Sequence, residues 1–292
     1  MLLALGIEIG SARDQCAQAE SGELVNVTSE TESAPSLATD PVADQKAAST
    51  AQARYSLGSE SRVVLSSEEG YELWAEAYDR DPNPLLALEE RTLKPLLRGV
   101  AGKQALDVAC GTGRWLQILL GLGACRAIGV DRSPGMLHMA ATKNCLCGRL
   151  VRGDCVALPF RSEVAGLIVC SFALGHVSQV RRFASELARV AKVQADVWVT
   201  DLHPEGYSRG WRAAFRHSSG AREIVAFAHS MEEVREAFES AGLELVDCLE
   251  PRLGEPERFI FTQTGKADLF RNLAGLPAVL ICHFKRRIPL GL

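Results

Sequence analysis

The sequence predicts an α/β fold built on a mostly parallel sheet, and three features of the chain support this prediction. An apolar run at 105–109 passes through Gly111 and Gly113 into a helical pattern, which is typical of a buried parallel strand followed by a loop and a helix. A second apolar run, 126–131, ends on the carboxylate Asp131. Short apolar runs and amphipathic segments then alternate through the rest of the chain, as repeated βα units do.

The bulk composition favours small-molecule chemistry. The chain has 292 residues, is 47% hydrophobic and carries a net charge of −4, so it is long enough for one large domain with an appendage. Its acidity gives no electrostatic footprint for nucleic acid, and no apolar run reaches membrane-spanning length. We therefore expect no nucleic acid or membrane partner.

The cysteines suggest a reducing compartment. There are nine, an odd number, and no convincing secretory signal precedes them, so a cytoplasmic location is expected. Cys145 and Cys147 lack a second Cys/His pair at a matching spacing, and no metal site is predicted.

The expected domain division separates a tail from a catalytic unit. Residues 11 to about 66 are rich in Ser, Thr, Ala, Glu and Gln, so they cannot bury enough apolar surface to offset the entropy of ordering. The predicted domains are therefore a disordered N-terminal tail over 1–66 and a folded domain over 67–292.

The folded part is expected to begin with two helices. Tyr71, Trp74 and Tyr78 are spaced by three and four residues and share one helical face. A second helix begins at Asn83-Pro84, as N-cap and first helical residue, and Pro95 should kink it.

The remaining elements follow from the same periodicities. Ser133-Pro134 starts a helix, the apolar face of residues 180–191 forms another, and a capping box at Ser230 with a Gly242 stop bounds a third. Residues 203–229 do not have a strand pattern, and we expect them to form an insert beside the fifth strand. The further strands are predicted at 149–154, 165–172, 195–202, 243–253 and 278–287.

The glycine loop and the strand-end acid together predict a nucleoside site. Gly111 and Gly113 allow close approach of the backbone and present N–H groups at the mouth of a helix. A carboxylate in the position of Asp131 typically binds ribose hydroxyls. A dinucleotide fingerprint would place Gly or Ala at position 116, whereas this chain has Leu116, which weakens a nicotinamide interpretation.

Three strings in this order resemble a known family. They are Leu-Asp-Val-Ala-Cys-Gly-Thr-Gly at 106–113, Gly-Val-Asp-Arg-Ser-Pro-Gly-Met-Leu at 129–137 and Gly-Asp-Cys-Val-Ala-Leu-Pro-Phe at 153–160. The chain from about 68 to 287 resembles class I S-adenosylmethionine-dependent methyltransferases, within them the ubiquinone, menaquinone and biotin-pathway group. The resemblance implies a Rossmann-like, doubly wound, seven-stranded sheet with an antiparallel last strand, and S-adenosylmethionine as cofactor.

The resemblance also implies roles for individual residues. It places Asp154 at the adenine amino group, which needs an acceptor when desolvated, and we favour this role over that of a solvated turn residue. It also places Met136 against the adenine, for which a core methionine is an equally natural alternative. Tyr71 and Tyr78 become candidates for a lid over the pocket. The chain departs from the family at 192–195, where Lys-Val-Gln-Ala replaces the usual Pro-Gly-Gly. The expected cofactor-binding residues are Asp107, Ala109, Cys110, Gly111, Gly113, Asp131, Arg132, Met136, Asp154, Cys155, Tyr71 and Tyr78.

Two histidines are candidate general bases for the methyl acceptor. His176 follows the fourth strand and His203 the fifth, at the sheet edge where open α/β folds place ligands. An imidazole titrates near neutral pH, and the alternative for each is a structural histidine bonded to a backbone carbonyl. The insert adds aromatic and guanidinium groups suited to a flat or carboxylate-bearing acceptor, namely Tyr207, Arg209, Trp211 and Arg212.

The predicted function is transfer of a methyl group from S-adenosylmethionine to a small-molecule acceptor. Positioning and desolvation supply much of the rate of such a reaction, and a base is needed only if the acceptor must lose a proton. Two alternatives stay open: a nicotinamide-dependent oxidoreductase and a catalytically idle nucleoside-binding protein. The oligomeric state and the identity of the acceptor are left open as well.

Overall fold

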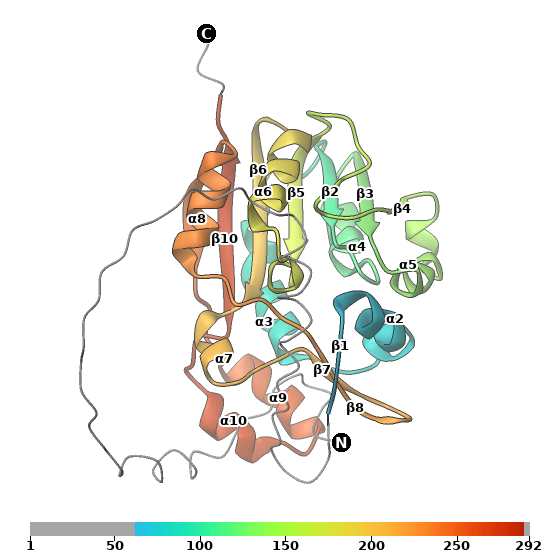
Figure 1. The fold of residues 1–292 in the computed structure, drawn as a ribbon, viewed down its shortest axis with the longest axis vertical. Coiled ribbons are helices and arrows are strands. Elements are labelled where there is room, and N and C mark those ends of the chain that lie inside the picture. Colours follow the sequence, from blue (N-terminus) through green and yellow to red (C-terminus); the bar gives the residue numbers. More distant parts are fainter. Residues whose placement is uncertain (1–61, 289–292) are drawn as a thin grey trace, which may run out of the picture. The chain divides into compact units, whose positions relative to one another are not determined.

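The computed structural model describes residues 62–288, and a seven-stranded sheet lies at their centre (Figure 1). Its strand order is β4-β3-β2-β5-β6-β10-β9. Pairing is parallel from β4 to β6, and β10 runs antiparallel to both of its neighbours. The predicted seven-stranded sheet with an antiparallel last strand is confirmed. The strands are β2 (Gln104–Val108), β3 (Arg126–Asp131), β4 (Leu150–Arg152), β5 (Ala165–Ser171), β6 (Ala191–Leu202), β9 (Leu243–Leu249) and β10 (Val279–Arg286).

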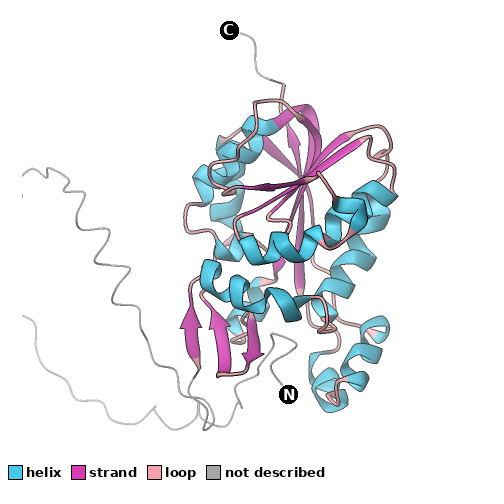
Figure 2. Cartoon of the chain, turned by 90° about the vertical axis from the view of Figure 1, so that its right-hand side faces the viewer, coloured by secondary structure: helices cyan, strands magenta, loops and turns pink. Residues whose placement is uncertain are grey.

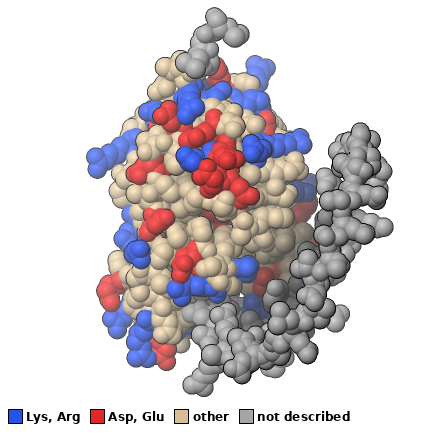
Figure 3. Space-filling view, turned by 60° about the vertical axis from the view of Figure 1, so that its left-hand side comes forward, with Lys and Arg blue, Asp and Glu red and all other residues tan. Residues whose placement is uncertain are grey.

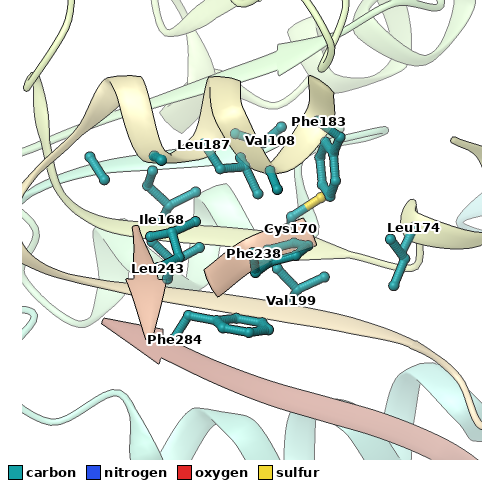
Figure 4. Packing of buried hydrophobic residues seen from close by; sticks show 14 of the residues in the cluster. Val108, Ile168, Cys170, Leu174, Phe183, Leu187, Val199, Phe238, Leu243 and Phe284 are labelled. Carbon is teal, nitrogen blue, oxygen red and sulfur yellow. The ribbon is translucent and has the colours of Figure 1, made fainter. Parts of the chain in front are cut away.

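Helices cover both faces of this twisted sheet (Figure 2), which is why the central strands are almost continuously apolar. In β5, Leu167 and Val169 belong to the core on one face, whereas Ile168 and Cys170 belong to the core on the other. The second core packs against α6 (Val180–Val190) and α8 (Met231–Ser240) (Figure 4). The first packs against α3 (Pro84–Leu93), α4 (Arg114–Gly121) and α5 (Pro134–Ala141).

A second, three-stranded sheet corrects the expectation for residues 203–229. These residues contain α7 (Pro204–Ser208) and a hairpin of β7 (Ala214–His217) and β8 (Gly220–Ile224). The prediction that they form no sheet was wrong. The strand β1 (Val63–Leu65) pairs in parallel with β8, and a partner about 160 residues away leaves no local periodicity to detect.

The boundary of the folded domain also moves. Residues Val63–Leu65 form β1, which pairs with β8. The folded domain therefore includes residues that we expected to belong to the tail, which was predicted to extend to residue 66. The rest of the predicted tail, residues 1–61, lies outside the described residues. Helix α2 (Ser67–Tyr78) follows directly and begins with a capping box between Ser66 and Glu69. In this arrangement each side chain accepts a hydrogen bond from the other residue's backbone N–H, which would otherwise have no partner at the start of the helix.

Two further segments add to the predictions. The helix α3 ends before Pro95, which lies in the short 3-10 helix Lys94–Leu96, so the predicted kink is a change of helix type. Two helices between the last strands were not predicted: α9 (Glu255–Gln263) and α10 (Ala267–Leu273). They bury Phe261 and Phe270 against the first core.

The surface carries mixed charge. Lysine and arginine side chains are interspersed with aspartate and glutamate on the face that Figure 3 shows. From Arg62 to Ile288, no helix is both long and apolar enough to cross a membrane.

Candidate active site

A cavity of about 230 Å³ lies at the carboxyl ends of the parallel strands, where open α/β sheets bind ligands. Residues that follow β2, β3, β4 and β5 each contribute to its wall, and α2 contributes from another side. We call it the first cavity. Of the twelve expected cofactor-binding residues, nine line it: Tyr71, Tyr78, Ala109, Gly111, Asp131, Arg132, Met136, Asp154 and Cys155.

The glycine loop and the strand-end acid meet in this wall. The Gly111 N–H donates to Oδ2 of Asp131 over 2.7 Å, and the Ser133 N–H donates to Oδ1 over 2.9 Å. Burial raises the pKa of the Asp131 carboxyl, while these amides favour its charged form. Gly111 has φ +53°, and a Cβ there would meet no protein atom within 4 Å. The backbone is therefore open to a ligand, beside a carboxylate that keeps lone pairs free.

The other three expected residues lie behind the wall rather than in it. Asp107 is buried, and its Oδ2 accepts the Leu116 N–H over 2.8 Å; burial raises its pKa to about 8. Cys110 is buried as well. Gly113 is the N-cap of α4 with φ +83°, where a Cβ would lie 2.4 Å from Leu146 Cδ1. These residues shape the loop, and the structure does not bring them to the first cavity.

The residues predicted to bind adenine also line the first cavity. Met136 is 2% exposed and lines the cavity together with Asp154 and Cys155. Oδ1 of Asp154 accepts the Val156 N–H over 3.1 Å, which orients the carboxyl, and Oδ2 lies 3.9 Å from Nη1 of Arg132.

Helix α2 is fixed to the cofactor loops by its acidic side chains. Oε2 of Glu72 accepts the Ser133 hydroxyl over 2.9 Å and the Gly135 N–H over 2.8 Å. Asp79 accepts the Thr112 hydroxyl over 2.6 Å. Helix α2, the predicted lid, thus contacts the loops that line the first cavity.

A second cavity adjoins the first. Four residues line both: Tyr71, Tyr78, Phe172 and His176. We call these four the shared wall. Phe172 follows β5 with φ +50°, a conformation that non-glycine residues rarely adopt and that is often found at functional sites. The second cavity is otherwise lined by Trp74, Asn83, Leu85, Leu86, Asp201, Leu202, Tyr207, Arg212, Ala213 and Ala226.

His176 lies in the shared wall with both ring nitrogens engaged. Its Nδ1 is 3.0 Å from the Val225 carbonyl oxygen, and its Nε2 is 2.9 Å from the Tyr71 hydroxyl. The two rings are T-shaped, with an interplanar angle of 85°. The expected general base is thus at the cavities, with a tyrosine on the nitrogen that would take a proton.

His203 differs from its expected place. It lines neither cavity; its Nδ1 accepts the Glu205 N–H over 3.1 Å as the N-cap of α7, and its Nε2 lies 3.4 Å from Glu250. Of the insert residues expected at the acceptor, Tyr207 and Arg212 line the second cavity, whereas Arg209 and Trp211 do not. Proline is favoured at the first position of a helix, so α7 begins at Pro204 and His203 becomes its N-cap. The imidazole therefore caps the helix and does not line either cavity.

Two site residues were not singled out from the sequence. Asp201 follows the pattern of Asp131, an acid at the end of a parallel strand, so the same rule would have found it. Its carboxylate accepts the Gly175 N–H, the Leu202 N–H over 2.6 Å and the Tyr207 hydroxyl over 3.3 Å. Trp74 was expected only to share a helical face with Tyr71 and Tyr78; its Nε1 is buried and has no hydrogen-bond partner among the described residues.

The buried carboxylate of Glu89 is connected to the wall of the first cavity through Arg114. Glu89 of α3 is fully buried and accepts hydrogen bonds from Arg114, Trp115 Nε1 and the Thr200 hydroxyl. Arg114 also donates to the Ser171 hydroxyl over 3.1 Å. Because Ser171 lines the first cavity, this network ties the α3–α4 layer to the ligand side of the sheet.

Comparison with known proteins agrees with this architecture. Residues 106–199 match the family model of a methyltransferase domain. A demethylmenaquinone methyltransferase of Tropheryma whipplei (strain Twist) is 32% identical over 142 residues, which are 46% of this chain and 58% of that protein. An uncharacterized methyltransferase of Emericella nidulans is 29% identical over 218 residues, with 61% and 76% of the two chains covered.

A solved structure shares the fold. The S-adenosylmethionine-dependent methyltransferase of Mesorhizobium loti superposes with a TM-score of 0.54 at 18% identity, over 68% of this chain and 98% of that one. The chain thus combines the matching domain, the three sequence strings and the sheet order with a cavity at the carboxyl ends of the strands. Residues 106–199 are thus similar to a methyltransferase domain, and the chain shares the fold of S-adenosylmethionine-dependent methyltransferases.

Proposed function

We propose that the protein transfers the methyl group of S-adenosylmethionine, bound in the first cavity, to a small-molecule acceptor bound in the second. The observation that carries this proposal is the shared wall. Tyr71, Tyr78, Phe172 and His176 border both cavities, so the two ligands would meet across these four side chains. Proximity of this kind is a major source of rate in bimolecular reactions.

The residues of the first cavity fit the cofactor. The Asp131 carboxylate, oriented by two backbone amides, would accept the ribose hydroxyls, and Asp154 would accept the adenine amino group. When bound, S-adenosylmethionine supplies an activated methyl group on a positively charged sulfur. The chain's own task is then to orient the acceptor and exclude water, which α2 does by closing onto the cofactor loops.

The acceptor that we propose is small and flat. Tyr71, Trp74, Tyr78, Phe172 and Tyr207 supply aromatic walls to the second cavity, and such surfaces suit an aromatic ring. The relatives from several bacteria carry the name demethylmenaquinone methyltransferase, which supports an acceptor of this kind.

Calorimetry on Asp131→Asn tests the cofactor site. The amide replaces one carboxylate oxygen by a donor, so one ribose hydrogen bond is lost and the other loses its charge. Charged hydrogen bonds are worth on the order of 1.5–3 kcal/mol, and we expect the affinity for S-adenosylhomocysteine, the demethylated product, to fall roughly 10- to 150-fold. Asp268→Asn is the matched control, because Asp268 is exposed on α10 and pairs with Arg271 there.

Unchanged affinity in Asp131→Asn would reject the assigned ribose contact. Tight binding of NAD in place of S-adenosylhomocysteine would favour an oxidoreductase. Binding without methylated product, in an extract supplied with isotopically labelled cofactor and analysed by mass spectrometry, would favour an idle nucleoside-binding protein.

A further inference from the structure

We propose that Tyr71 takes a proton from a hydroxyl group of the acceptor while passing its own proton to His176, and that the acceptor is an aromatic compound with an ionisable hydroxyl. This inference rests on the proposed function, since it assigns chemistry to the shared wall between the two cavities.

The direction of the Tyr71–His176 hydrogen bond follows from the groups around the ring. The Val225 carbonyl can only accept, so the imidazole nitrogen 3.0 Å from it, Nδ1, carries the hydrogen. In the neutral ring Nε2 is then a lone-pair acceptor, and the Tyr71 hydroxyl 2.9 Å away is the donor. His176 therefore presents its basic nitrogen to a phenol, and Tyr71 is the group of this pair that an acceptor hydroxyl would touch.

Asp201 lies beside this pair. Burial raises the pKa of its carboxyl, whereas the neighbouring His176 and the donors from Gly175, Leu202 and Tyr207 favour its charged form. In that form the carboxylate would offset the positive charge that the transferred proton brings to the imidazole. Burial raises the pKa of Tyr71 well above its usual range, so its phenol stays protonated until both transfers are coupled. The titratable groups that act on Tyr71 are Tyr78, Asp201, Tyr207 and Asp131.

The second cavity gives the class of acceptor. Its aromatic walls suit a ring, and Trp74 contributes a buried Nε1–H that has no partner among the described residues. A buried donor without a partner is unfavourable, and an oxygen on the acceptor would satisfy it. Arg212 adds a guanidinium that stacks over Tyr207 at 5.6 Å. The chemistry that this cavity recognises is an aromatic ring that carries oxygen.

The proton balance is complete. The acceptor O–H bond breaks and its proton forms a bond to Tyr71 Oη, while the Tyr71 O–H bond breaks and its proton moves to His176 Nε2. The acceptor keeps the electron pair as an oxyanion, which attacks the methyl carbon, and the carbon–sulfur bond breaks with its electrons on the departing sulfur. His176 later releases the proton to water.

Absorbance of a bound phenol tests the relay without turnover. Phenol and 2-naphthol are the probes, titrated into the full chain saturated with S-adenosylhomocysteine and into the chain alone, across pH. We expect the wild type to show the 2-naphtholate band at a lower pH than free 2-naphthol. Tyr71→Phe keeps the ring and removes the hydroxyl, and His176→Gln removes the base. In each variant the 2-naphtholate band should appear at the same pH as for free 2-naphthol.

Kinetics supply a second measurement. With S-adenosylmethionine and 2-naphthol, Tyr71→Phe and His176→Gln should each lower kcat by about 100-fold or more, as loss of general base catalysis does. The double variant should lose no more than either single one, because the two residues act as a unit. His217→Gln is the matched control, since His217 lies in β7 and lines neither cavity.

The outcomes separate this inference from the proposed function. If the wild type binds S-adenosylhomocysteine but binds neither probe, or if Tyr71→Phe keeps the lowered ionisation of 2-naphthol, the inference is overturned. If neither the wild type nor any variant binds S-adenosylhomocysteine, the proposed function fails. The pH at which the 2-naphtholate band appears with the wild type alone, compared with Tyr71→Phe alone, then still tests the proton transfer through Tyr71. Calorimetry and melting temperature of each variant confirm that the fold is kept.

Discussion

Replacing Glu89 by Gln should destabilise the protein more than any surface ion-pair change. Glu89 is fully buried, and its carboxylate accepts hydrogen bonds from Arg114, from Trp115 Nε1 and from the Thr200 hydroxyl. Gln keeps the shape but removes the negative charge beside Arg114, whose side chain is only 26% exposed. Breaking a buried pair in this way costs about 3–5 kcal/mol, because the remaining charge is left uncompensated.

Urea unfolding, followed by circular dichroism, measures the effect. At an m value of about 2 kcal/mol/M, the expected cost lowers the midpoint by roughly 1.5–2.5 M urea with little change in slope. Glu90→Gln is the control, since Glu90 is the next residue in α3, lies 3.8 Å from the same Arg114 and is 37% exposed. Surface pairs contribute about 0–1 kcal/mol, so its midpoint should stay near that of the wild type.

A loss below about 1 kcal/mol in Glu89→Gln would refute this reasoning. It would mean that other groups or water compensate the charge of Arg114 once the carboxylate is gone. The double variant Glu89→Leu/Arg114→Met discriminates further. If the unpaired charge is the cause, removing both partners should recover most of the lost stability.

Two further perturbations follow from the structure. The Asp196 carboxylate accepts hydrogen bonds from His283 and Lys103, which lower its pKa from 3.8 to about 2. Because the pKa is lower in the folded protein, the charged carboxylate stabilises the fold by about 2 kcal/mol above pH ~4, and this stabilisation is lost as the pH falls towards ~2. Asp196→Asn should therefore lower stability at pH 6 but hardly at pH 2, as urea titrations at both pH values would show. Gly113→Ala should cost about 2–5 kcal/mol, from a left-handed φ and the contact with Leu146. Gly99→Ala shares the positive φ but meets nothing within 4 Å, so its melting temperature should fall less, and equal losses would rule out the Leu146 contact.

The sequence predicts the central sheet well because its signals are local. The run 105–109, the glycines after it and Asp131 each belong to a continuous strand, loop or helix start, and hydrophobic periodicity identifies such units. The strand-end rule likewise predicts that Asp131 and His176 lie at the same edge. These placements need no knowledge of distant contacts.

The features that were missed depend on partners far along the chain. Strand β8 is stabilised by β1, which lies inside the expected tail, and three residues of β1 carry no recognisable pattern on their own. The place of His203 depends on a helix of five residues, α7, too short for a periodic signal. Trp74 has the spacing of a core residue, and only its unpaired Nε1 in three dimensions distinguishes it.

The parallel pairing of β1 with β8 links the two cavities mechanically. The Leu65 carbonyl accepts the Val225 N–H over 2.9 Å, and the Val225 carbonyl accepts from His176. Because β1 leads directly into α2, a movement of α2 that admits a nucleoside would also pull on the segment that holds His176.

The consequence is a preferred order of addition. In the proposed reaction, bound cofactor would hold α2 and, through β1 and β8, the segment around His176 more firmly, so the cofactor should enter first and its demethylated form should leave last. Steady-state kinetics would then show S-adenosylhomocysteine competing with S-adenosylmethionine but inhibiting noncompetitively against the acceptor. In the proposed reaction, the ratio of the two cofactor forms would then limit the rate, whatever the supply of acceptor.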